Sequence, residues 1–158
     1  MNTSCPQKDK IEPAAVCPNC THQGRAIAIE TLKSQLKPIS MHKLAVEATY
    51  YFCAHPTCPI VYFNHAQVFE PEEIREKVFQ KNHDADCLVC YCFGYTRAEV
   101  QNDAQTNTPQ ILSQIKAGTK NKQCACELRN PQGRCCLGNI AELQKQENSK
   151  NTSTLSGS

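Results

Sequence analysis

The chain has 158 residues, of which 6% are aromatic and none is Trp. It is therefore long enough for one ordinary domain or two small ones, neither with a large core. Seventeen basic and 15 acidic residues give a net charge of +2, so nucleic acid or an anionic membrane is not expected as a partner. No stretch approaches the roughly 20 apolar residues of a transmembrane helix, and we expect no membrane insertion.

Cysteine is the unusual component of this composition, with twelve in the chain. The first 17 residues have no apolar segment typical of a signal peptide and carry Asp and Glu, so the sequence predicts a cytoplasmic protein. In a reducing compartment, clustered cysteines more often bind metal than form disulfides. Metal binding is therefore preferred over a disulfide framework.

The first part of the chain predicts a flexible leader and a small β-rich unit. Residues 1–16 are polar and lack periodicity, and Cys5 within them is expected to be a free thiol. A short alternating and then helical pattern follows, which Pro38 should end. Segments 46–53 and 59–64 are rich in β-branched and aromatic residues and predict two strands.

The later part of the chain predicts helices. Residues 71–81 indicate either a short helix or an irregular connector. Thr96 followed by Glu99 forms a capping box, so a helix of about ten residues should begin there. A second helix should start at Pro109 and end at a Gly118 cap.

A third helix is expected from Asn139 to about Gln146, before a polar tail of low complexity. The predicted fold class is α+β, with a small zinc-ribbon-like β unit followed by a small helical 2Fe-2S domain. The expected divisions are a flexible leader at 1–16, a zinc-binding ribbon-like domain at 17–70, a helical 2Fe-2S domain at 71–147 and a disordered tail at 148–158.

The first cysteine set has the spacing of a structural zinc site. Its members are Cys17, Cys20, Cys53 and Cys58. Two short-range pairs joined by a long insert are typical of a zinc ribbon, in which all four thiolates reach one tetrahedral ion. His55 lies inside the second pair, so a Cys3His site is an alternative, and unligated buried thiols are another.

The second cysteine set has different spacing. Its members are Cys90, Cys92, Cys124, Cys126, Cys135 and Cys136. A 2Fe-2S cluster requires four thiolates, two on each iron, and accepts them from separate loops, so there are more candidates than positions. From the residues alone, the simplest site pairs the two one-residue-spaced sets, Cys90 with Cys92 and Cys124 with Cys126. Vicinal cysteines rarely share one metal, so at most one of the last two is expected to be a ligand.

Three segments carry a resemblance to a known family. They are YYFCAHPTCPIVYF at 50–63, CYCFGYT at 90–96 and CACELRNPQGRCCLGNI at 124–140. The sequence from about Cys17 to Ile140 resembles the amino-terminal domain of CopZ-type copper chaperones. The resemblance implies a zinc ribbon fused to a fold similar to bacterioferritin-associated ferredoxin, with one zinc ion and one 2Fe-2S cluster.

The resemblance also implies ligands at matching positions. Zinc is expected at Cys17, Cys20, Cys53 and Cys58, and the cluster at Cys90, Cys92, Cys124 and one cysteine of the vicinal pair. Cys135 is favoured over Cys136 and Cys126 as the fourth ligand. Turn-forming residues at 130–133 should fold the chain back and bring Cys135 toward Cys124.

The resemblance implies a role in copper homeostasis, including reduction of Cu(II) to Cu(I), with a copper-transport or other heavy-metal-binding protein as partner. The family's archetype continues into a heavy-metal domain with a Met-x-Cys-x-x-Cys loop, which this sequence lacks. Direct copper delivery by this chain is therefore not expected. Thiols outside the two sites are candidates for Cu(I).

Two other functions compete with this one. One is a ferredoxin-like electron carrier that reduces a metal-storage protein or another metalloprotein, and the other is a purely structural zinc protein. Phosphate-binding loops and catalytic triads are absent from the sequence. We therefore expect a redox protein rather than a classical enzyme.

Overall fold

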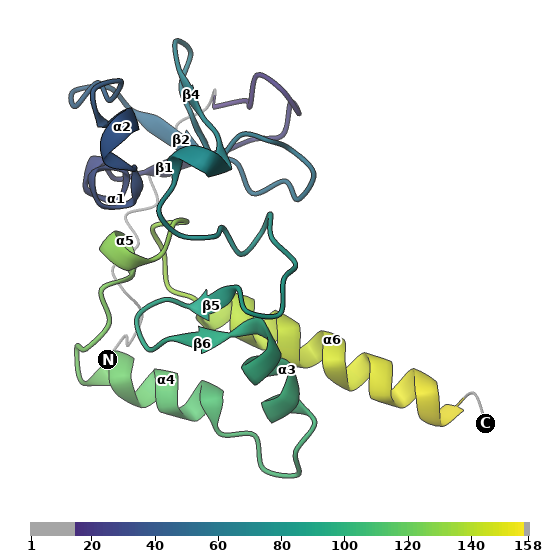
Figure 1. The fold of residues 1–158 in the computed structure, drawn as a ribbon. Helices are drawn as coiled ribbons and strands as arrows, with labels where there is room; N and C mark the ends of the chain where they lie inside the picture. The colour runs from purple at the N-terminus through teal and green to yellow at the C-terminus, as the bar shows by residue number, and fades with distance from the viewer. Residues whose placement is uncertain (1–14, 157–158) are drawn as a thin grey trace.

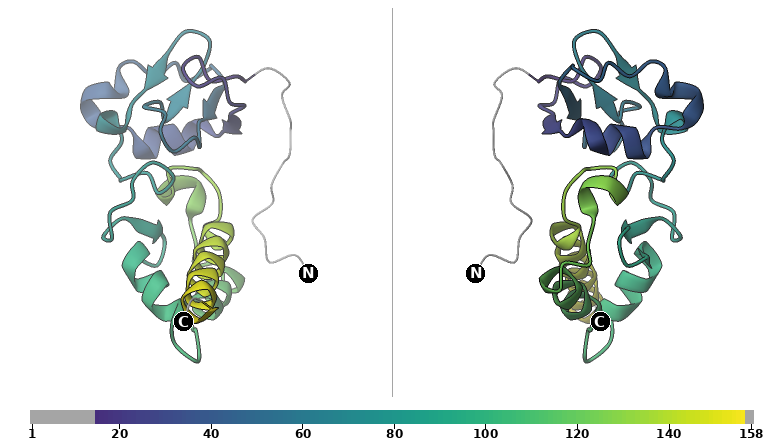
Figure 2. Two further views of the ribbon diagram at one scale, coloured as in Figure 1. Left: turned by 90° about the vertical axis from the view of Figure 1, so that its right-hand side faces the viewer. Right: turned by 90° about the vertical axis from the view of Figure 1, so that its left-hand side faces the viewer.

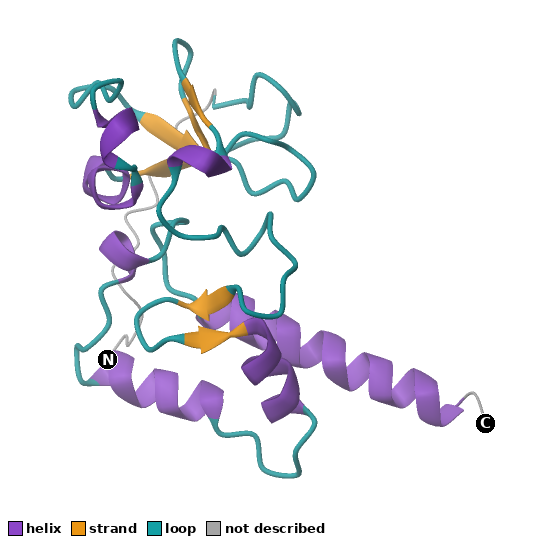
Figure 3. Ribbon diagram, in the orientation of Figure 1, coloured by secondary structure: helices purple, strands orange, loops and turns teal. Residues whose placement is uncertain are grey.

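The computed structural model describes residues 15–156, with side chains to residue 150, and these residues form two lobes joined by an irregular connector (Figures 1 and 2). The larger, four-stranded sheet lies in the first lobe, a two-stranded sheet and most of the helical structure lie in the second, and long loops occur in both (Figure 3). The expected α+β fold class is confirmed. None of the described helices is both long and apolar enough to cross a membrane.

The first lobe is built on a four-stranded antiparallel sheet with the strand order β1-β2-β3-β4. The strands are β1 (Arg25–Ile27), β2 (Tyr50–Phe52), β3 (Tyr62–Phe63) and β4 (Val68–Phe69). Strands β2 and β3 confirm the two that the sequence predicts. Phe52 lies opposite Tyr62 across this pair, with ring centroids 6.1 Å apart, and such cross-strand aromatic pairs stabilise short strands.

Helix α1 (Ile29–Gln35) covers this sheet, and Pro38 opens a second short helix, α2 (Pro38–Met41). The predicted helix ends before Pro38 as expected, and the proline then occupies a first helical position, where its missing N–H costs nothing. The core of the lobe consists of Leu32, Leu36, Tyr50, Phe52, Val61, Tyr62, Phe69, Ile74 and Val78. The apolar packing of this lobe therefore continues past residue 70, through the short 3-10 turn η1 (Pro71–Glu73) and into the connector.

In the described part of the chain, the second lobe contains a two-stranded hairpin and four helices. Its elements are β5 (Leu88–Cys90), β6 (Tyr95–Thr96), α3 (Arg97–Ala104), α4 (Ile111–Lys120), α5 (Cys126–Arg129) and α6 (Leu137–Ser156). Its core consists of Val89, Cys90, Val100, Ile111, Ile115, Cys136, Ile140 and Leu143. Two members of the second cysteine set are therefore part of this small apolar core.

The helix boundaries agree only in part with the predictions. The capping box at Thr96 and Glu99 is confirmed and begins α3. Helix α4 begins at Ile111 rather than at Pro109. The carboxylate of Asp103 accepts hydrogen bonds from the N–H groups of Gln110 and Ile111 at the start of this helix. Gly118 does not end α4, because the helix continues to Lys120. A Cβ at Gly118 would lie 2.3 Å from a ring carbon of Phe93, so this glycine permits close packing.

Helix α6 is longer than the helix expected to end near Gln146, and it includes most of the segment at 148–158 predicted to be disordered. No Gly or Pro occurs between Asn139 and Ser156 to stop it. At the other end, Ala15 is buried and Val16 pairs with Gln23, so the first lobe begins before residue 17. The rest of the predicted leader, including Cys5, lies outside the described residues.

The two lobes meet where α1 faces α5 and the loop after it (Figure 1). The side-chain amide of Gln35 donates hydrogen bonds of 2.9 Å to the carbonyls of both Leu128 and Arg129. Gly133, at φ +68°, packs so close that a Cβ there would lie 3.0 Å from Ile27. The first lobe thus supports the segment that carries the later cysteines.

Candidate metal centres

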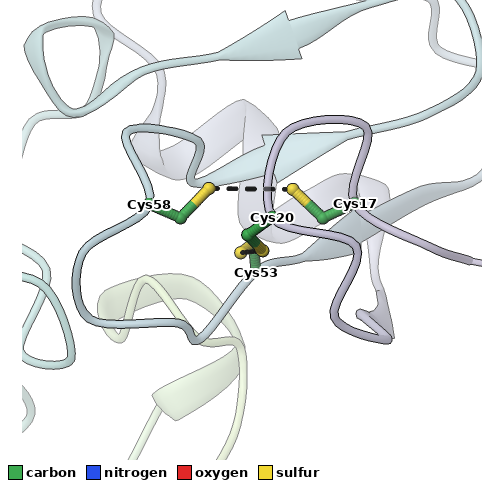
Figure 4. Close-up of side chains that lie close together, drawn as sticks. All are labelled: Cys17, Cys20, Cys53 and Cys58. Carbon is green, nitrogen blue, oxygen red and sulfur yellow. Dashed lines mark hydrogen bonds between the residues drawn. The ribbon is translucent and has the colours of Figure 1, made fainter.

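The four cysteines of the first set meet at one end of the sheet, where two hairpin loops face each other (Figure 4). Their sulfur atoms all lie within 4.8 Å of one another. The Cys17 and Cys58 sulfurs are 3.7 Å apart, and those of Cys20 and Cys53 are 3.6 Å apart. A tetrahedral zinc with bonds of about 2.3 Å requires sulfurs about 3.8 Å apart, so this arrangement fits a zinc ion without rearrangement.

Local backbone geometry explains how each loop presents its two sulfurs. In the first loop, the Thr21 N–H donates to the Cys17 carbonyl, and Thr21 itself adopts a positive φ of 61°. This turn brings the chain back so that the Cys17 N–H bonds to the His22 carbonyl. In the second loop, the Cys53 N–H is held by the Val61 carbonyl at 2.9 Å. The site is therefore preorganised by backbone hydrogen bonds.

Burial and nearby polar groups give Cys17, Cys53 and Cys58 different acidities. Burial raises the pKa of Cys53 to about 12 and also raises that of Cys17. Burial acts on Cys58 as well, but the N–H of Ile60 and the side-chain amide of Asn19 outweigh it and lower the Cys58 pKa to about 7. A bound cation would replace the protons on the more basic thiols, which couples metal binding to folding.

Lys81 reaches this centre from the connector, and no motif in the sequence marks it as part of the site. Its ammonium donates to the carbonyls of His55 at 2.8 Å and Cys58 at 3.0 Å, and it lies 3.8 Å from the Cys53 sulfur. A cation in this position offsets the negative charge of a four-thiolate site and fixes the loop that carries two of its ligands.

His55 does not join the buried thiols, so the structure gathers four cysteines rather than a Cys3His set. Instead, His55 lies against His22, with ring centroids 4.2 Å apart, and both are close to Cys20. The sequence did contain a signal for this pair, because each histidine stands two residues after a cysteine of the first set, Cys20 or Cys53.

The second set is brought together between the β5–β6 hairpin, α5 and the start of α6. The sulfurs of Cys92 and Cys126 lie 3.4 Å apart. The side chain of Cys136 is the main cause of a lowered pKa at Cys90. Cys126 interacts with Cys135, and also with Cys136 and Cys92. These contacts link five thiols into one continuous group, those of Cys90, Cys92, Cys126, Cys135 and Cys136.

Backbone N–H groups add positive potential to this group. The Ala125 N–H donates to the Cys92 sulfur at 3.2 Å. The side chain of Cys126 lowers the pKa of Cys92 to about 7, against the effect of burial. At the start of α6, the side chains of Cys126 and Cys136 lower the pKa of Cys135 to about 2, with help from the Leu137 N–H. N–H donors and a helix amino terminus favour thiolates and anionic centres.

Cys135 belongs to this linked group, whereas Cys124 and Cys87 lie apart from it. Cys135 is half-buried and contacts Cys126 and Cys136. Cys124 is half-buried and makes no hydrogen bond to another thiol within residues 15–150. Cys87 is buried, and its sulfur faces the Lys77 carbonyl at 3.8 Å. Of the predicted ligands, the linked group contains Cys90, Cys92 and Cys135, and it is the sulfur of Cys126 rather than that of Cys124 that lies 3.4 Å from the Cys92 sulfur.

Comparison with known proteins agrees with this architecture. Residues 14–75 match the family zf_CopZ, described as a zinc binding domain. The copper chaperone CopZ of Archaeoglobus fulgidus is 29% identical over 127 residues, which is 80% of this chain and 60% of that protein. The chain thus spans less than two thirds of the length of this relative.

The X-ray structure of the Archaeoglobus fulgidus CopZ N-terminal domain is similar to the whole two-lobed arrangement. The TM-score is 0.69 at 28% sequence identity, and the match covers 81% of this chain and 96% of that domain. The resemblance of the sequence to the amino-terminal domain of CopZ-type copper chaperones is therefore confirmed, while the implied 2Fe-2S cluster of the second half stays a prediction. Residues 14–75 match the zinc-binding CopZ domain, and the chain has the fold of the amino-terminal domain of a CopZ copper chaperone.

Proposed function

We propose that this chain is a metal-binding redox module of the copper-chaperone class, with one structural zinc and one 2Fe-2S cluster. The observation that carries the proposal is the pair of separate sulfur groups, one in each lobe, within a fold like that of the CopZ N-terminal domain. We propose Cys17, Cys20, Cys53 and Cys58 as the zinc ligands. A closed four-thiolate site leaves no position for substrate, so its role is to stabilise the first lobe.

For the cluster, we propose Cys90, Cys92, Cys126 and Cys136. Cys126 is the cysteine that lies against Cys92, and Cys136 is the member of the vicinal pair that acts on Cys90. The donor set consists of four thiols from three separate segments, which suits a 2Fe-2S cluster. The set expected from the resemblance, with Cys124 and Cys135, is the competing assignment.

A 2Fe-2S cluster held here would supply one electron at a time, which is the number needed to convert Cu(II) to Cu(I). The chain's own residues would set the conditions for this chemistry. The Ala125 N–H and the amino end of α6 stabilise negative charge on the sulfurs, while the half-buried Cys92 and Cys135 mark the edge nearest to solvent. We propose that copper approaches at this edge, with a copper-transport or other heavy-metal-binding protein as the source or recipient.

The same half-buried edge favours a second candidate function, that of an electron carrier to a metalloprotein partner. Electron transfer depends on a redox centre close to the surface, and this edge would serve a protein partner as well as a copper ion. In either case eleven described cysteines are free thiols, so we propose a reducing compartment such as the cytoplasm.

The decisive experiment is anaerobic purification followed by metal analysis, visible absorption and electron paramagnetic resonance. We expect one zinc, two irons and two inorganic sulfides per chain, with a reduced-state signal typical of a 2Fe-2S centre. Rapid mixing of the reduced protein with Cu(II) should reoxidise it with one Cu(I) formed per chain. A protein that contains no iron under these conditions would refute the cluster. A reducible cluster that does not react with Cu(II) would favour the electron carrier.

A further inference from the structure

We propose that His22 and His55, together with the Cys20 thiolate, form a second metal site beside the zinc centre, and that it takes a monovalent copper ion. One ligand atom from each of the three residues lies within 4.8 Å of the other two. The imidazole rings are 4.2 Å apart between centroids, at 34° to each other. One ion can therefore contact both rings and the sulfur after small side-chain movements.

Hydrogen bonds orient both rings as they are oriented in metal sites. Nδ1 of His22 lies 3.1 Å from the Cys20 carbonyl oxygen. Because a carbonyl only accepts, Nδ1 must carry the proton, and the lone pair is left on Nε2. Nδ1 of His55 lies 3.2 Å from the hydroxyl of Thr57, which donates or accepts according to the tautomer, so this bond orients the ring without fixing which nitrogen is protonated. Metal-binding histidines usually have such a partner on the second nitrogen.

The three residues of this site are more exposed than the other cysteines of the zinc centre, so the site lies beside that centre on its outer side. Cys17, Cys53 and Cys58 are buried, whereas Cys20 is half-buried and His22 is exposed. Cys20 is therefore the zinc-site thiol that faces outward. A thiolate that binds one metal retains lone pairs, so the Cys20 sulfur could bridge the buried ion and an outer one.

The donor atoms select the kind of ion. One thiolate and two imidazoles form a soft, three-coordinate set that suits Cu(I), whereas magnesium and calcium require oxygen ligands. No carboxylate joins this group within the described residues. The site itself follows from geometry, while the choice of copper over a second zinc rests on the proposed copper-handling function.

The test compares Cu(I) capacity in matched variants of the full chain. Anaerobic protein is titrated with Cu(I) against a chromophoric chelator, and the zinc and iron contents and visible absorption of each sample are recorded. We expect the double variant His22→Ala/His55→Ala to bind one equivalent of Cu(I) less than the unaltered chain, with zinc unchanged. The control His65→Ala/His83→Ala, with two other exposed histidines, should retain full capacity. X-ray absorption at the copper edge should show nitrogen and sulfur ligands.

Three results would overturn the site: equal Cu(I) capacity in the double variant and the unaltered chain, copper uptake matched by release of zinc, or an all-sulfur copper signal. The second would mean that copper enters the four-cysteine centre itself. If the double variant binds one equivalent of zinc less than the unaltered chain, rather than one equivalent of Cu(I) less, the copper assignment is wrong. Since iron and visible absorption are read from the same samples, loss of the proposed 2Fe-2S centre would be recognised separately.

Discussion

Tyr62 lies in the core of the first lobe, and its hydroxyl donates a hydrogen bond to the backbone carbonyl of Pro131, in the loop between the later cysteines of the second lobe. This contact spans the boundary between the two proposed metal centres. Burial raises the pKa of Tyr62 well above its usual range, so the hydroxyl stays protonated and remains a donor. Stability of one lobe is thereby linked to the geometry of the other.

Replacing this hydroxyl tests the link directly. Tyr62→Phe keeps the ring in the core but leaves the Pro131 carbonyl without its donor, so we expect a loss of about 1–3 kcal/mol in the free energy of unfolding. Urea unfolding followed by circular dichroism gives this value. Tyr95→Phe is the control, because that hydroxyl bonds to Gln114 at the surface, and its effect should stay within about 0.5 kcal/mol. Equal losses in both variants would contradict the proposed link.

The parts of this arrangement that the sequence predicts depend on short-range spacing. The four sulfurs of the first set meet because each pair lies within one tight loop, and α3 begins where the capping box of Thr96 and Glu99 places it. Each of these patterns is formed within a few consecutive residues, so it can be recognised without knowledge of the tertiary structure.

The contacts that the sequence does not predict depend on long-range packing. The docking of Gln35 onto α5 joins residues more than 90 positions apart, and no local pattern marks it. Because all candidate cluster ligands lie between Cys90 and Cys136, the sequence alone predicts that the second half of the chain holds this cofactor without the first half. That expectation is still a prediction, but the support given by α1 makes it less favourable.

The choice between Cys124 and Cys126 is another case in which local spacing is insufficient. In an extended strand, side chains two residues apart share one face. The backbone at Ala125 departs from that conformation, at φ −137° and ψ 51°, and α5 starts directly after it. The two cysteines are therefore placed differently, and only Cys126 reaches the sulfur of Cys92.

Removal of zinc should unfold the first lobe. Its apolar core is small, and the binding energy of a structural zinc contributes directly to folding. We expect the variant Cys17→Ser to lose zinc, to lose part of its circular dichroism signal and to be cleaved rapidly between residues 15 and 78. Cys87→Ser is the matched control, since it alters a buried thiol outside both sulfur groups. A protease-resistant first lobe in zinc-free protein would show that the metal is not structural.

Lys81 should raise the zinc affinity of the four-cysteine centre without being a ligand. Lys81→Met keeps most of the aliphatic stem but removes the ammonium that contacts the second zinc loop, so we expect zinc affinity to fall by about 10–100-fold. Competition with a chromophoric chelator measures the change. Lys77→Met should retain normal affinity, because that ammonium pairs with Asp84 and Asp86 at the surface. A similar loss in both variants would indicate a general charge effect.

Glu73 provides a pH-dependent contribution to the first lobe. Burial opposes its ionisation, but the Lys43 ammonium, the Glu70 N–H and the Ser40 hydroxyl outweigh burial and lower its pKa below the usual 4.5. A carboxyl group with a lowered pKa stabilises the fold above pH 4.5, and this contribution is lost as pH falls through the lowered value.

The variant Glu73→Gln should therefore be less stable than the unaltered chain at pH 7, by less than about 1 kcal/mol because the pair is partly exposed. The difference should shrink below pH 4.5. Unfolding midpoints measured between pH 3.5 and 7 test this, with the exposed Glu72→Gln as control. A stability difference that grows on acidification would contradict the sign.

The assignment of the cluster ligands is tested by four serine variants. Cys126 contacts the Cys92 sulfur, and Cys136 acts on Cys90, so Cys126→Ser and Cys136→Ser should lose the visible absorption of a 2Fe-2S centre or shift it strongly. Cys124→Ser should keep a near-normal spectrum, and Cys135→Ser should keep the cluster with an altered reduction potential, because its thiol lies beside two proposed ligands. Iron content, visible spectra and potentiometric titration provide the measurements. A colourless Cys124→Ser beside a normal Cys126→Ser would restore the sequence-based set, and a colourless Cys135→Ser beside a normal Cys136→Ser would exchange the vicinal ligands.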